Sequence, residues 1–466
     1  MPRADYDLVT IGSGAAALAA AIRAADLGAR VAIIERGTLG GTCVNVGCIP
    51  SKRLLAASEA YRRAGDHPFT GAGTRQSGLD MGALVAGKDR IVADLRARKY
   101  ADLAARYGFE VIGGSARFTS PETVAVDGRE VGGGHFLVAT GAAPWTPAIP
   151  GLAHAGHLTS TTALELTELP ESLVVVGGNY VGLELGQLFA NLGARVTIVE
   201  ALPRLAPGEE PEISAAIAAV LADQGVEVLT GAHAVRAEAG APKALLARVD
   251  GVERRLVAQE ILVATGRRPV LDGLGLEAAG VERDERGGLV LDPELRTTNP
   301  RVFAAGDVTG APQFVYVAAA QGTLAADNAL AGAGQRMDDT ALPRVTFTDP
   351  AIAAVGLTEG DATLAGHRVE VRVLDLAEVP RAIVAGDTRG LVKLVAERET
   401  GRLLGAHVIA HGAGDVIQAA VYAVKLGLTV REVADTWAPY LTMAEALKLT
   451  AQTFTREVAQ LSCCAA

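Results

Sequence analysis

Residues 7–17 read DLVTIGSGAAA and lead, through an alanine-rich stretch, to VAIIE at residues 31–35. The opening apolar run is typical of a buried parallel strand, and Gly12 and Gly14 allow a tight turn into a helix. Glycines at these positions let a pyrophosphate approach the backbone and rest on the helix N-terminus. Glu35 ends the second strand about 20 residues further on, where a carboxylate accepts hydrogen bonds from ribose hydroxyls. Together these features predict a dinucleotide-binding module.

The same pattern occurs a second time. Residues 173–176 (LVVV) form the expected strand, residues 177–182 (GGNYVG) the turn, and residues 196–200 (VTIVE) the next strand, which ends in Glu200. Asn179 occupies the middle glycine position, and we expect the turn to survive because asparagine tolerates a positive φ angle better than most residues. Two dinucleotide modules in one chain imply two nucleotides, and hydride transfer is the economical reason to hold both.

The chain has four cysteines, arranged as two pairs near its opposite ends. Cys43 and Cys48 lie in GGTCVNVGCIPSK at residues 40–52, whereas Cys463 and Cys464 are adjacent. Cysteines that serve only as small core residues carry no such pattern. Two cysteines five apart at the start of a helix can close a disulfide, and a helix N-terminus lowers the pKa of a thiolate. The pairs therefore predict electron transfer or the binding of a thiophilic ion.

Length and composition set further bounds. A chain of 466 residues is expected to form two to four domains. Its net charge of −10 argues against nucleic acid or an anionic membrane as partner. Residues 11–22 are apolar enough for a signal peptide, but Asp5 and Asp7 precede them and the glycines follow a phosphate-binding pattern. With no stretch long enough to span a bilayer, we expect a cytoplasmic, reducing location, where a cysteine pair is catalytic or metal-binding.

Further turns at residues 139–144 (ATGAAP), 264–269 (ATGRRP) and 304–308 (AAGDV) are expected to return the chain between domains. Together with residues 40–52, they resemble the flavin-dependent pyridine nucleotide–disulfide oxidoreductases over nearly the whole chain. This resemblance implies an α/β fold with two three-layer, Rossmann-like nucleotide-binding domains and a C-terminal α+β dimerisation domain. The implied boundaries are 1–150 and 270–338 for the FAD-binding domain, 151–269 for the NAD(P)-binding domain, and 339–466 for the dimerisation domain with a flexible Cys-Cys tail.

The resemblance also implies roles for individual residues. Cys48 would face the flavin, Cys43 would exchange with substrate, and Lys52 would hold negative charge on the reduced flavin. Glu184 would be the acidic partner of Lys52, and Tyr180 would gate the nicotinamide pocket. Implied contacts to FAD are Gly12, Gly14, Ala17, Glu35, Gly37, Thr42, Lys52, Ala116, Asp307 and Val315. Implied contacts to the nicotinamide dinucleotide are Gly177, Gly182, Glu200 and Gly266.

The substrate is indicated by a departure near the C-terminus. Disulfide-reducing members carry His-Pro-Thr-x-x-Glu, with histidine as the acid–base, whereas residues 440–445 read YLTMAE and no histidine follows His411. A phenol with a pKa near ~10 cannot shuttle protons at neutral pH as imidazole does. A soft metal ion needs thiolates instead, and the chain ends in LSCCAA at residues 461–466. These two segments resemble the mercury-reducing members of the family.

We therefore expect reduction of Hg(II), presented as thiol complexes, to elemental mercury by NADPH or NADH through FAD. The resemblance implies a homodimer in which Cys463 and Cys464 of one subunit pass the ion to Cys43 and Cys48 of the other. Tyr440 would line the path of the metal.

Several alternatives stay open. The protein could be a thiol–disulfide reductase like the large thioredoxin reductases or dihydrolipoyl dehydrogenases, or a metal buffer without activity. Tyr440 could be a packed aromatic residue, and the tail could be an uninvolved terminus. Glu200 favours NADH because a carboxylate repels a 2′-phosphate, whereas the family commonly uses NADPH and Arg204 could serve it. Whether a separate N-terminal metal-binding domain once preceded the chain is also open.

Overall fold

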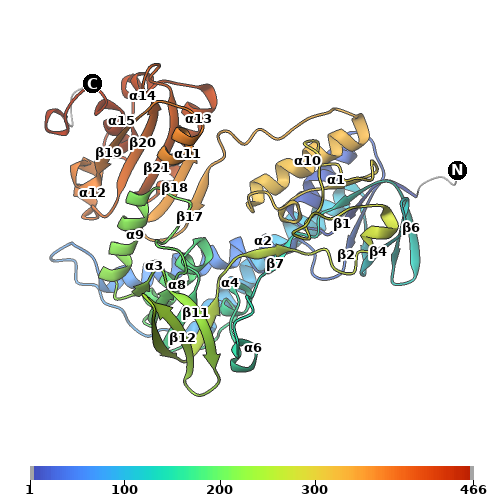
Figure 1. The fold of residues 1–466 in the computed structure, drawn as a ribbon, viewed down its shortest axis with the longest axis horizontal. Helices are drawn as coiled ribbons and strands as arrows, with labels where there is room; N and C mark the ends of the chain where they lie inside the picture. Colours follow the sequence, from blue (N-terminus) through green and yellow to red (C-terminus); the bar gives the residue numbers. More distant parts are fainter. Residues whose placement is uncertain (1–4, 462–466) are drawn as a thin grey trace. The chain divides into compact units, whose positions relative to one another are not determined.

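The computed structural model describes residues 5–461, so Cys463 and Cys464 lie outside the described residues. The chain divides into two compact units. Figure 1 shows its helices and strands, coloured along the sequence. Unit 1 combines Met1–Arg53, Ala83–Trp145 and Gly266–Met337. Unit 2 combines Leu54–Gly82, Thr146–Thr265 and Asp338–Ala466.

Unit 1 is built on a parallel sheet in which β1 lies between β2 and β6, with β3 beside β2 and β16 beside β6. β4 and β5 continue the sheet as an antiparallel extension of β6. The strands are β1 (Tyr6–Ile11), β2 (Val31–Glu35), β3 (Glu110–Gly113), β4 (Ala116–Ser120), β5 (Thr123–Val126), β6 (Arg129–Val138), β7 (Ala142–Pro144), β15 (Arg267–Pro269) and β16 (Val302–Ala304). The helices are α1 (Ala15–Asp26), α2 (Gly41–Asn45), α4 (Met81–Arg96), α5 (Asp102–Tyr107) and α10 (Val315–Ala331).

Side chains of the parallel strands alternate between two buried faces, as the pleat requires. Leu8, Ile33 and Leu137 share a cluster with the alanines of α1 and α10. Val9 and Phe136 belong to a second cluster, on the side of β4 and β5. Both faces are therefore covered, which explains why these strands read as continuous apolar runs.

Helices α1 and α10 pack closely because their contact is built from small residues. A Cβ atom at Gly322 of α10 would overlap the carbonyl oxygen of Ala16 in α1. The alanine-rich composition of α1 is thus a packing requirement, since bulkier side chains would hold the two helices apart.

Unit 2 repeats this plan and adds a second sheet. The parallel order is β10-β9-β8-β14, and an antiparallel β11-β12-β13 sheet covers one face through Leu245 and Leu256. On the other face, Val175 and Ile198 lie against Gly186 of α8. The strands are β8 (Ser172–Val176), β9 (Arg195–Val199), β10 (Glu227–Leu229), β11 (His233–Glu238), β12 (Lys243–Val249), β13 (Val252–Ala258) and β14 (Glu260–Val263). The helices are α3 (Cys48–Gly65), which begins in unit 1, α6 (Leu152–Ala155), α7 (Ser160–Ala163), α8 (Tyr180–Leu192) and α9 (Pro211–Asp223).

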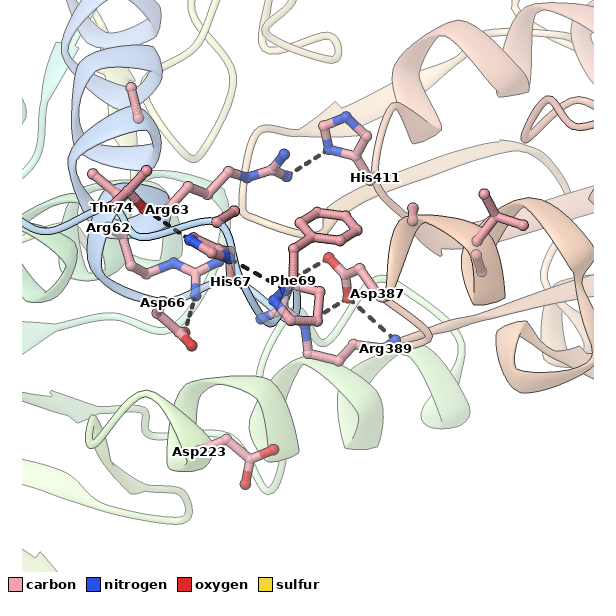
Figure 2. A pocket seen from close by; sticks show the side chains of 18 of the residues that line it. Arg62, Arg63, Asp66, His67, Phe69, Thr74, Asp223, Asp387, Arg389 and His411 are labelled. Carbon is pink, nitrogen blue, oxygen red and sulfur yellow. Dashed lines mark hydrogen bonds and ion pairs between the residues drawn. The ribbon is translucent and has the colours of Figure 1, made fainter.

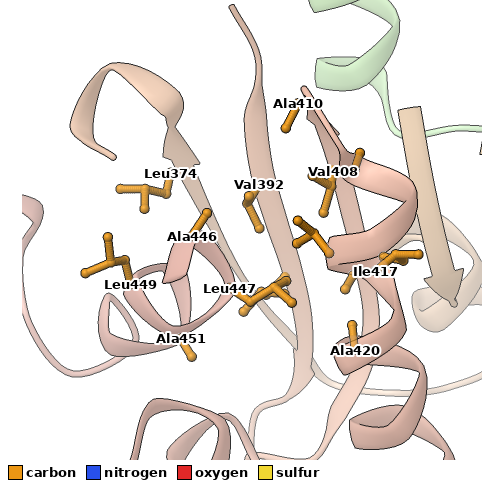
Figure 3. Close-up of a cluster of buried hydrophobic side chains, with 14 of the residues drawn as sticks. Leu374, Val392, Val408, Ala410, Ile417, Ala420, Ala446, Leu447, Leu449 and Ala451 are labelled. Atoms are coloured by element: carbon orange, nitrogen blue, oxygen red, sulfur yellow. The ribbon is translucent and has the colours of Figure 1, made fainter. Parts of the chain in front are cut away.

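The remainder of unit 2 is an antiparallel sheet of order β17-β18-β21-β20-β19 with helices packed on it. Figure 3 shows its core, in which Leu374, Val392 and Val408 from the strands meet Ile417 of α13 and Leu447 of α15. The strands are β17 (Arg344–Thr346), β18 (Ala351–Gly356), β19 (Val369–Asp375), β20 (Leu391–Glu397) and β21 (Leu403–Ala410). The helices are α11 (Glu359–Leu364), α12 (Pro380–Ala385), α13 (Ala413–Leu426), α14 (Val430–Asp435) and α15 (Glu445–Gln452).

The predicted α/β class with two dinucleotide-type modules and a C-terminal α+β region is therefore confirmed. Within residues 5–461, none of the helices has the length and apolar character that crossing a membrane would require.

Candidate active site

The first dinucleotide turn depends on backbone contact. Gly12 has a φ angle of +106°, and a Cβ atom there would overlap the carbonyl oxygen of Ala139. Gly14 is the N-cap of α1, and no side chain caps this helix. Its first N–H groups therefore suit the pyrophosphate of a dinucleotide, and Ala17 lies buried in the first turns of the helix.

Glu35 links this turn to the segment that carries the cysteines. Its carboxylate accepts hydrogen bonds from the Ser13 hydroxyl at 2.5 Å and from the Gly37 N–H at 2.7 Å. The Ser13 oxygen in turn accepts the Gly40 N–H at 3.0 Å. The residue predicted for ribose binding thus also connects the dinucleotide turn with the cysteine segment. Ser13 was not predicted from the sequence, because its role depends on this tertiary contact.

The cysteine pair lies on two different helices. Cys43 is in the middle of the short α2, and Cys48 is the first residue of α3. Both are half-buried thiols. The pKa of Cys43 is raised, first by the hydrogen bond with the Cys48 side chain and then by burial, although the Lys52 charge lowers it. The pKa of Cys43 is therefore raised and not lowered as expected, because the hydrogen bond with Cys48 and burial outweigh the favourable charge of Lys52.

Two further side chains of unit 1 act on the pair, and neither was predicted. Tyr100 lies on a π-helical turn, Ala97–Ala101, and a Cβ atom at Gly40 would lie 3.4 Å from its ring. Burial, followed by the charges of the two cysteines, raises the pKa of Tyr100. Arg267 is the second: burial lowers its pKa, while Asp307 and Cys48 raise it. The position of Arg267 directly after Gly266 could have indicated its role. Tyr100 could not have been found, because a π-helical turn has no sequence signature.

Asp307 opens a 3-10 helix at the end of β16, in the predicted Gly-Asp turn. Burial raises the pKa of Asp307, while Arg267, whose Nε lies 4.0 Å away, lowers it. The preceding Gly306 N–H donates to Gln321 of α10 at 2.8 Å, which fixes the turn on that helix. The structure brings into unit 1 the predicted residues Gly12, Gly14, Ala17, Glu35, Gly37, Thr42, Cys43, Cys48, Lys52, Ala116, Gly266, Asp307 and Val315.

The second dinucleotide turn has the same geometry. Gly177 has a φ angle of +111°, and an added Cβ atom would lie 2.5 Å from the Ala264 carbonyl oxygen. A Cβ atom at Gly182 would overlap the carbonyl oxygen of Gly177. The turn survives as expected, but Asn179 has φ −105°, so a tolerance of positive φ angles is not the reason. The middle position is a helix N-cap in extended conformation, which any residue adopts, and the positive φ belongs to the first glycine.

Glu200 follows β9 and is buried, with both carboxylate oxygens in use. They accept hydrogen bonds from the N–H groups of Gly178 at 2.6 Å and Leu202 at 2.7 Å. The nearby Arg204 donates to the Pro207 carbonyl oxygen at 2.7 Å. A negative charge is thus fixed at the end of this strand.

Tyr180 and Glu184 are on α8, and their described contacts are within unit 2. The Tyr180 hydroxyl donates to Glu209 at 3.3 Å. The buried Glu184 carboxylate accepts the Phe347 N–H at 2.9 Å. The pairing of Glu184 with Lys52 remains a prediction.

Tyr440 lies in a turn before α15 and is 54% exposed, so within one chain it is not a packed core residue. The next residue, Leu441, has a φ angle of +59°. Burial raises the pKa of Glu445, and a hydrogen bond from the Leu441 backbone lowers it. Glu445 therefore supports the turn that presents Tyr440. The metal ligands predicted at Cys463 and Cys464 lie outside the described residues.

A pocket of about 950 Å³ in unit 2 is a second place to consider, and Figure 2 shows its lining. Beside it, Glu59, Asp349 and His411 bring possible metal ligands together. However, Arg62 binds Asp349 at 2.5 Å, and Arg63 reaches Nδ1 of His411 at 2.9 Å. Since arginines already pair with the two carboxylates and Arg63 donates to the imidazole, the cluster is an ion-pair network, and the cysteine pair in unit 1 is the better candidate active site.

Two family models match the chain. The model described as "Pyridine nucleotide-disulphide oxidoreductase" matches residues 6–322. The dimerisation domain of the same family matches residues 342–451.

Individual relatives agree with these matches. "Mercuric reductase" from Streptomyces lividans is 57% identical, with 99% of this chain and 98% of that protein covered. "Mercuric reductase" from Bacillus cereus is 50% identical, with 99% and 73% covered. Among solved structures, the HOCl-induced flavoprotein disulfide reductase RclA from Escherichia coli has a TM-score of 0.86 at 33% identity, with 96% of this chain and 99% of that chain covered. The chain therefore belongs to the pyridine nucleotide-disulphide oxidoreductase family.

Proposed function

We propose that this protein reduces Hg(II) to elemental mercury with electrons from NADPH or NADH. The observation that carries the proposal is the 57% identity to a mercuric reductase over nearly the full length of both chains. Tyr440 supports it, because a tyrosine stands where a disulfide reductase needs a histidine.

The cofactors are FAD and a nicotinamide dinucleotide. Both dinucleotide turns fit such ligands, since each combines a positive-φ glycine with a helix N-terminus that no side chain caps. We assign FAD to residues 1–150 and 270–338, the nicotinamide dinucleotide to 151–269, and dimerisation to 339–466. FAD supplies the step that carries an electron pair from the nicotinamide toward the cysteine pair.

The residues of the chain handle the metal. The partner subunit's Cys463 and Cys464 take Hg(II) from its thiol carriers, and ligand exchange passes it to Cys43 and Cys48. Two electrons from NAD(P)H then reduce Hg(II) to Hg(0), which releases NAD(P)⁺ and one proton. Lys52 favours the thiolate of Cys43, as its effect on the Cys43 pKa requires. A reducing cytoplasm suits this chemistry, because thiols there stay available for the metal.

The test measures NAD(P)H consumption by FAD-loaded protein after addition of Hg(II) in excess small thiol, or of a disulfide. We expect stimulation by Hg(II) and little by the disulfide. Stimulation by the disulfide alone would instead identify a thiol–disulfide reductase, and metal binding without NAD(P)H consumption a metal buffer. In a Cys463→Ala/Cys464→Ala variant, turnover should fall when the mercury is held by bulky thiols. Unchanged turnover would remove the tail from the mechanism.

For the nicotinamide we favour NADH. The carboxylate of Glu200 is held at the end of β9 by two backbone N–H groups, where it repels a 2′-phosphate. A steady-state comparison should give a lower KM for NADH than for NADPH, and a Glu200→Ala variant should reduce the difference. A lower KM for NADPH in the unmodified protein would reverse this assignment.

A further inference from the structure

A buried carboxylate lies behind the second dinucleotide turn. The hydroxyl of Tyr180, the first residue of α8, donates to Oε1 of Glu209 at 3.3 Å. Glu209 is only 2% exposed and precedes α9 by one residue. A charge at this depth is stable only with partners that compensate for lost hydration, so its surroundings show what holds it.

Two side chains from the C-terminal sheet hold Glu209. Arg344 of β17 brings Nε and Nη2 each to 3.4 Å from the two carboxylate oxygens. Nδ1 of the fully buried His407 of β21 lies 3.9 Å from Oε2 of the same carboxylate group. Burial raises the pKa of Glu209, but His407 and Arg344 together lower it below the ordinary value. Glu209 is therefore a carboxylate anion at neutral pH.

The neighbouring residues keep Glu209 from moving with Tyr180. Glu210 accepts the Glu359 N–H at 2.6 Å and binds Nζ of Lys393 at 3.0 Å. Lys393 of β20 also binds Glu212 in the first turn of α9, at 2.9 Å. The segment that carries Glu209 is thus attached to β17, β20, β21 and α11 and is a fixed point for the tyrosine.

The same C-terminal segment contacts α8 at two further positions. The Phe347 N–H donates to Glu184, and the Asp349 N–H donates to Gln187 at 2.7 Å. With Tyr180 held through Glu209, residues at i, i+4 and i+7 of α8 are tied along one face of the helix. These contacts on one face fix the orientation of α8 and of the side chain of its first residue.

We propose that Glu209 is a positioning residue for the nicotinamide step, which fixes the phenol of Tyr180 at the second dinucleotide turn. This inference rests on the proposed function and on the role that the family resemblance implies for Tyr180, the gating of the nicotinamide pocket. A long aromatic side chain at a helix start has several rotamers, and an anchored acceptor selects one before the nucleotide arrives. His407 acts through Glu209, whereas Arg344 acts through Glu209 and also directly on the Tyr180 hydroxyl, so the dimerisation region shapes the reductant site of its own chain.

The test is a double-mutant cycle on FAD-loaded protein with Glu209→Gln, Tyr180→Phe and the combined variant. Tyr180→Phe removes the hydroxyl that donates to Glu209, together with its contact to Arg344, and leaves the ion pair between Glu209 and Arg344 in place. Dissociation constants for NADH and NADPH should change by about fivefold or more in the same direction in both single variants, the scale of a hydrogen bond to a charged group. The combined variant should change them no more than Tyr180→Phe alone, because Tyr180→Phe already removes the hydrogen bond that Glu209→Gln weakens.

A second readout follows the tyrosine directly. Burial first, and then the charge of Glu209, raise the pKa of Tyr180 to about 12. In Glu209→Gln, the pKa of Tyr180 should fall, as measured by NMR on isotope-labelled tyrosine with Tyr180→Phe to assign the signal. The matched control is Glu212→Gln, which alters a partner of Lys393 on the same helix turn and should leave both readouts unchanged.

Additive effects in the cycle, or a Tyr180 pKa that Glu209→Gln leaves in place, would overturn the positioning role. So would equal effects of Glu212→Gln, since these would indicate a merely structural network. Hg(II)-dependent NAD(P)H consumption by the unmodified protein is measured separately. If it is present while the cycle is additive, the proposed function stands and only the role of Glu209 fails.

Discussion

The thiol of Cys43 is kept protonated mainly by its partner. The hydrogen bond with Cys48 is the largest contribution that raises its pKa, burial is the second, and Lys52 opposes both. A thiol in this state is a poor nucleophile until the neighbouring sulfur or the cation changes. The pair is thus suited to act as a unit, which a two-coordinate metal ion requires.

Replacement of Cys48 by alanine should speed the alkylation of Cys43. The substitution removes the largest cause of the raised pKa, and each unit by which the pKa falls should increase the rate at neutral pH about tenfold. The rate is measured by mass spectrometry after iodoacetamide treatment, in a Cys463→Ala/Cys464→Ala background. Lys52→Met is the control, because it removes the cation that lowers the pKa of Cys43 and should therefore slow the alkylation of Cys43. Slower alkylation in Cys48→Ala would show that the partner thiol does not hold the proton.

A single added methyl group should impair the second dinucleotide site and leave the first one intact. In Gly182→Ala the new Cβ atom overlaps the Gly177 carbonyl oxygen, so the second turn must open and NAD(P)H affinity should fall by about tenfold or more. The FAD absorbance should remain, since the first turn belongs to unit 1. Gly186→Ala on the same helix is the control, because its Cβ would meet only side-chain atoms, of Ile198 at 3.2 Å and of Val175 at 3.7 Å, and no backbone atom. Loss of FAD in Gly182→Ala, or full nucleotide binding, would contradict the assignment.

Among the elements, the strands and the helices that follow the glycine turns were predictable from sequence. Their apolar runs are continuous because both sheet faces are covered. The turns are recognisable because close backbone contact there requires glycine, and glycines at fixed spacing are visible in the sequence. The π-helical turn that carries Tyr100 was not predictable, because it depends on how α4 ends against the cysteine segment. The contact between Tyr180 and Glu209 likewise joins residues 29 apart, and only tertiary structure brings them together.

The buried charge on β20 should be a strong determinant of stability. Lys393 is 1% exposed and binds Glu210, Glu212 and Glu359. Lys393→Met leaves these carboxylates without their cation and should cost about 3–5 kcal/mol, measured by urea unfolding. Lys425→Met, which removes an exposed ion pair, should cost about 1 kcal/mol or less. Similar midpoint shifts in both variants would show that the buried cluster is not stabilising.

The same cluster has a defined pH dependence. Burial lowers the pKa of Lys393, but the hydrogen bonds that its ammonium donates to Glu359, Glu212 and Glu210 outweigh this effect, so the pKa is raised. A raised lysine pKa gives stability that is fully present below the ordinary value of about 10.4 and is lost as the pH rises through the folded value. The difference in stability between the wild type and Lys393→Met should therefore narrow only in strongly alkaline solution.

At the scale of the whole molecule, the dimerisation domain leaves large apolar side chains exposed. Tyr422 and Leu426 are 61% and 71% exposed and lie one turn apart on α13, and Trp437 is 93% exposed. Side chains of this size on one helix face are typical of a protein–protein contact. We expect a second copy of the chain to cover them.

Placing opposite charges on that face should dissociate the dimer. A Tyr422→Asp/Leu426→Lys variant should sediment as a monomer at concentrations where the wild type is dimeric, because charged groups are costly to bury. Its Hg(II)-dependent turnover should fall as well if, as we propose, each site receives the ion from the partner's tail. Val252→Lys on β13 changes an equally exposed apolar residue of the second module and should alter neither property. A dimeric double variant would place the contact elsewhere.

The carbonyl oxygens of Ala139 and Ala264 lie against the first glycine of each turn, and both belong to the segment by which the chain leaves its parallel sheet. A module that ends before this exit segment would lack the wall that shapes its phosphate loop. A fragment that transfers the first dinucleotide module to another protein must therefore extend past Thr140, and one that transfers the second module must extend past Thr265. The exit strand belongs to the ligand site as much as the loop itself.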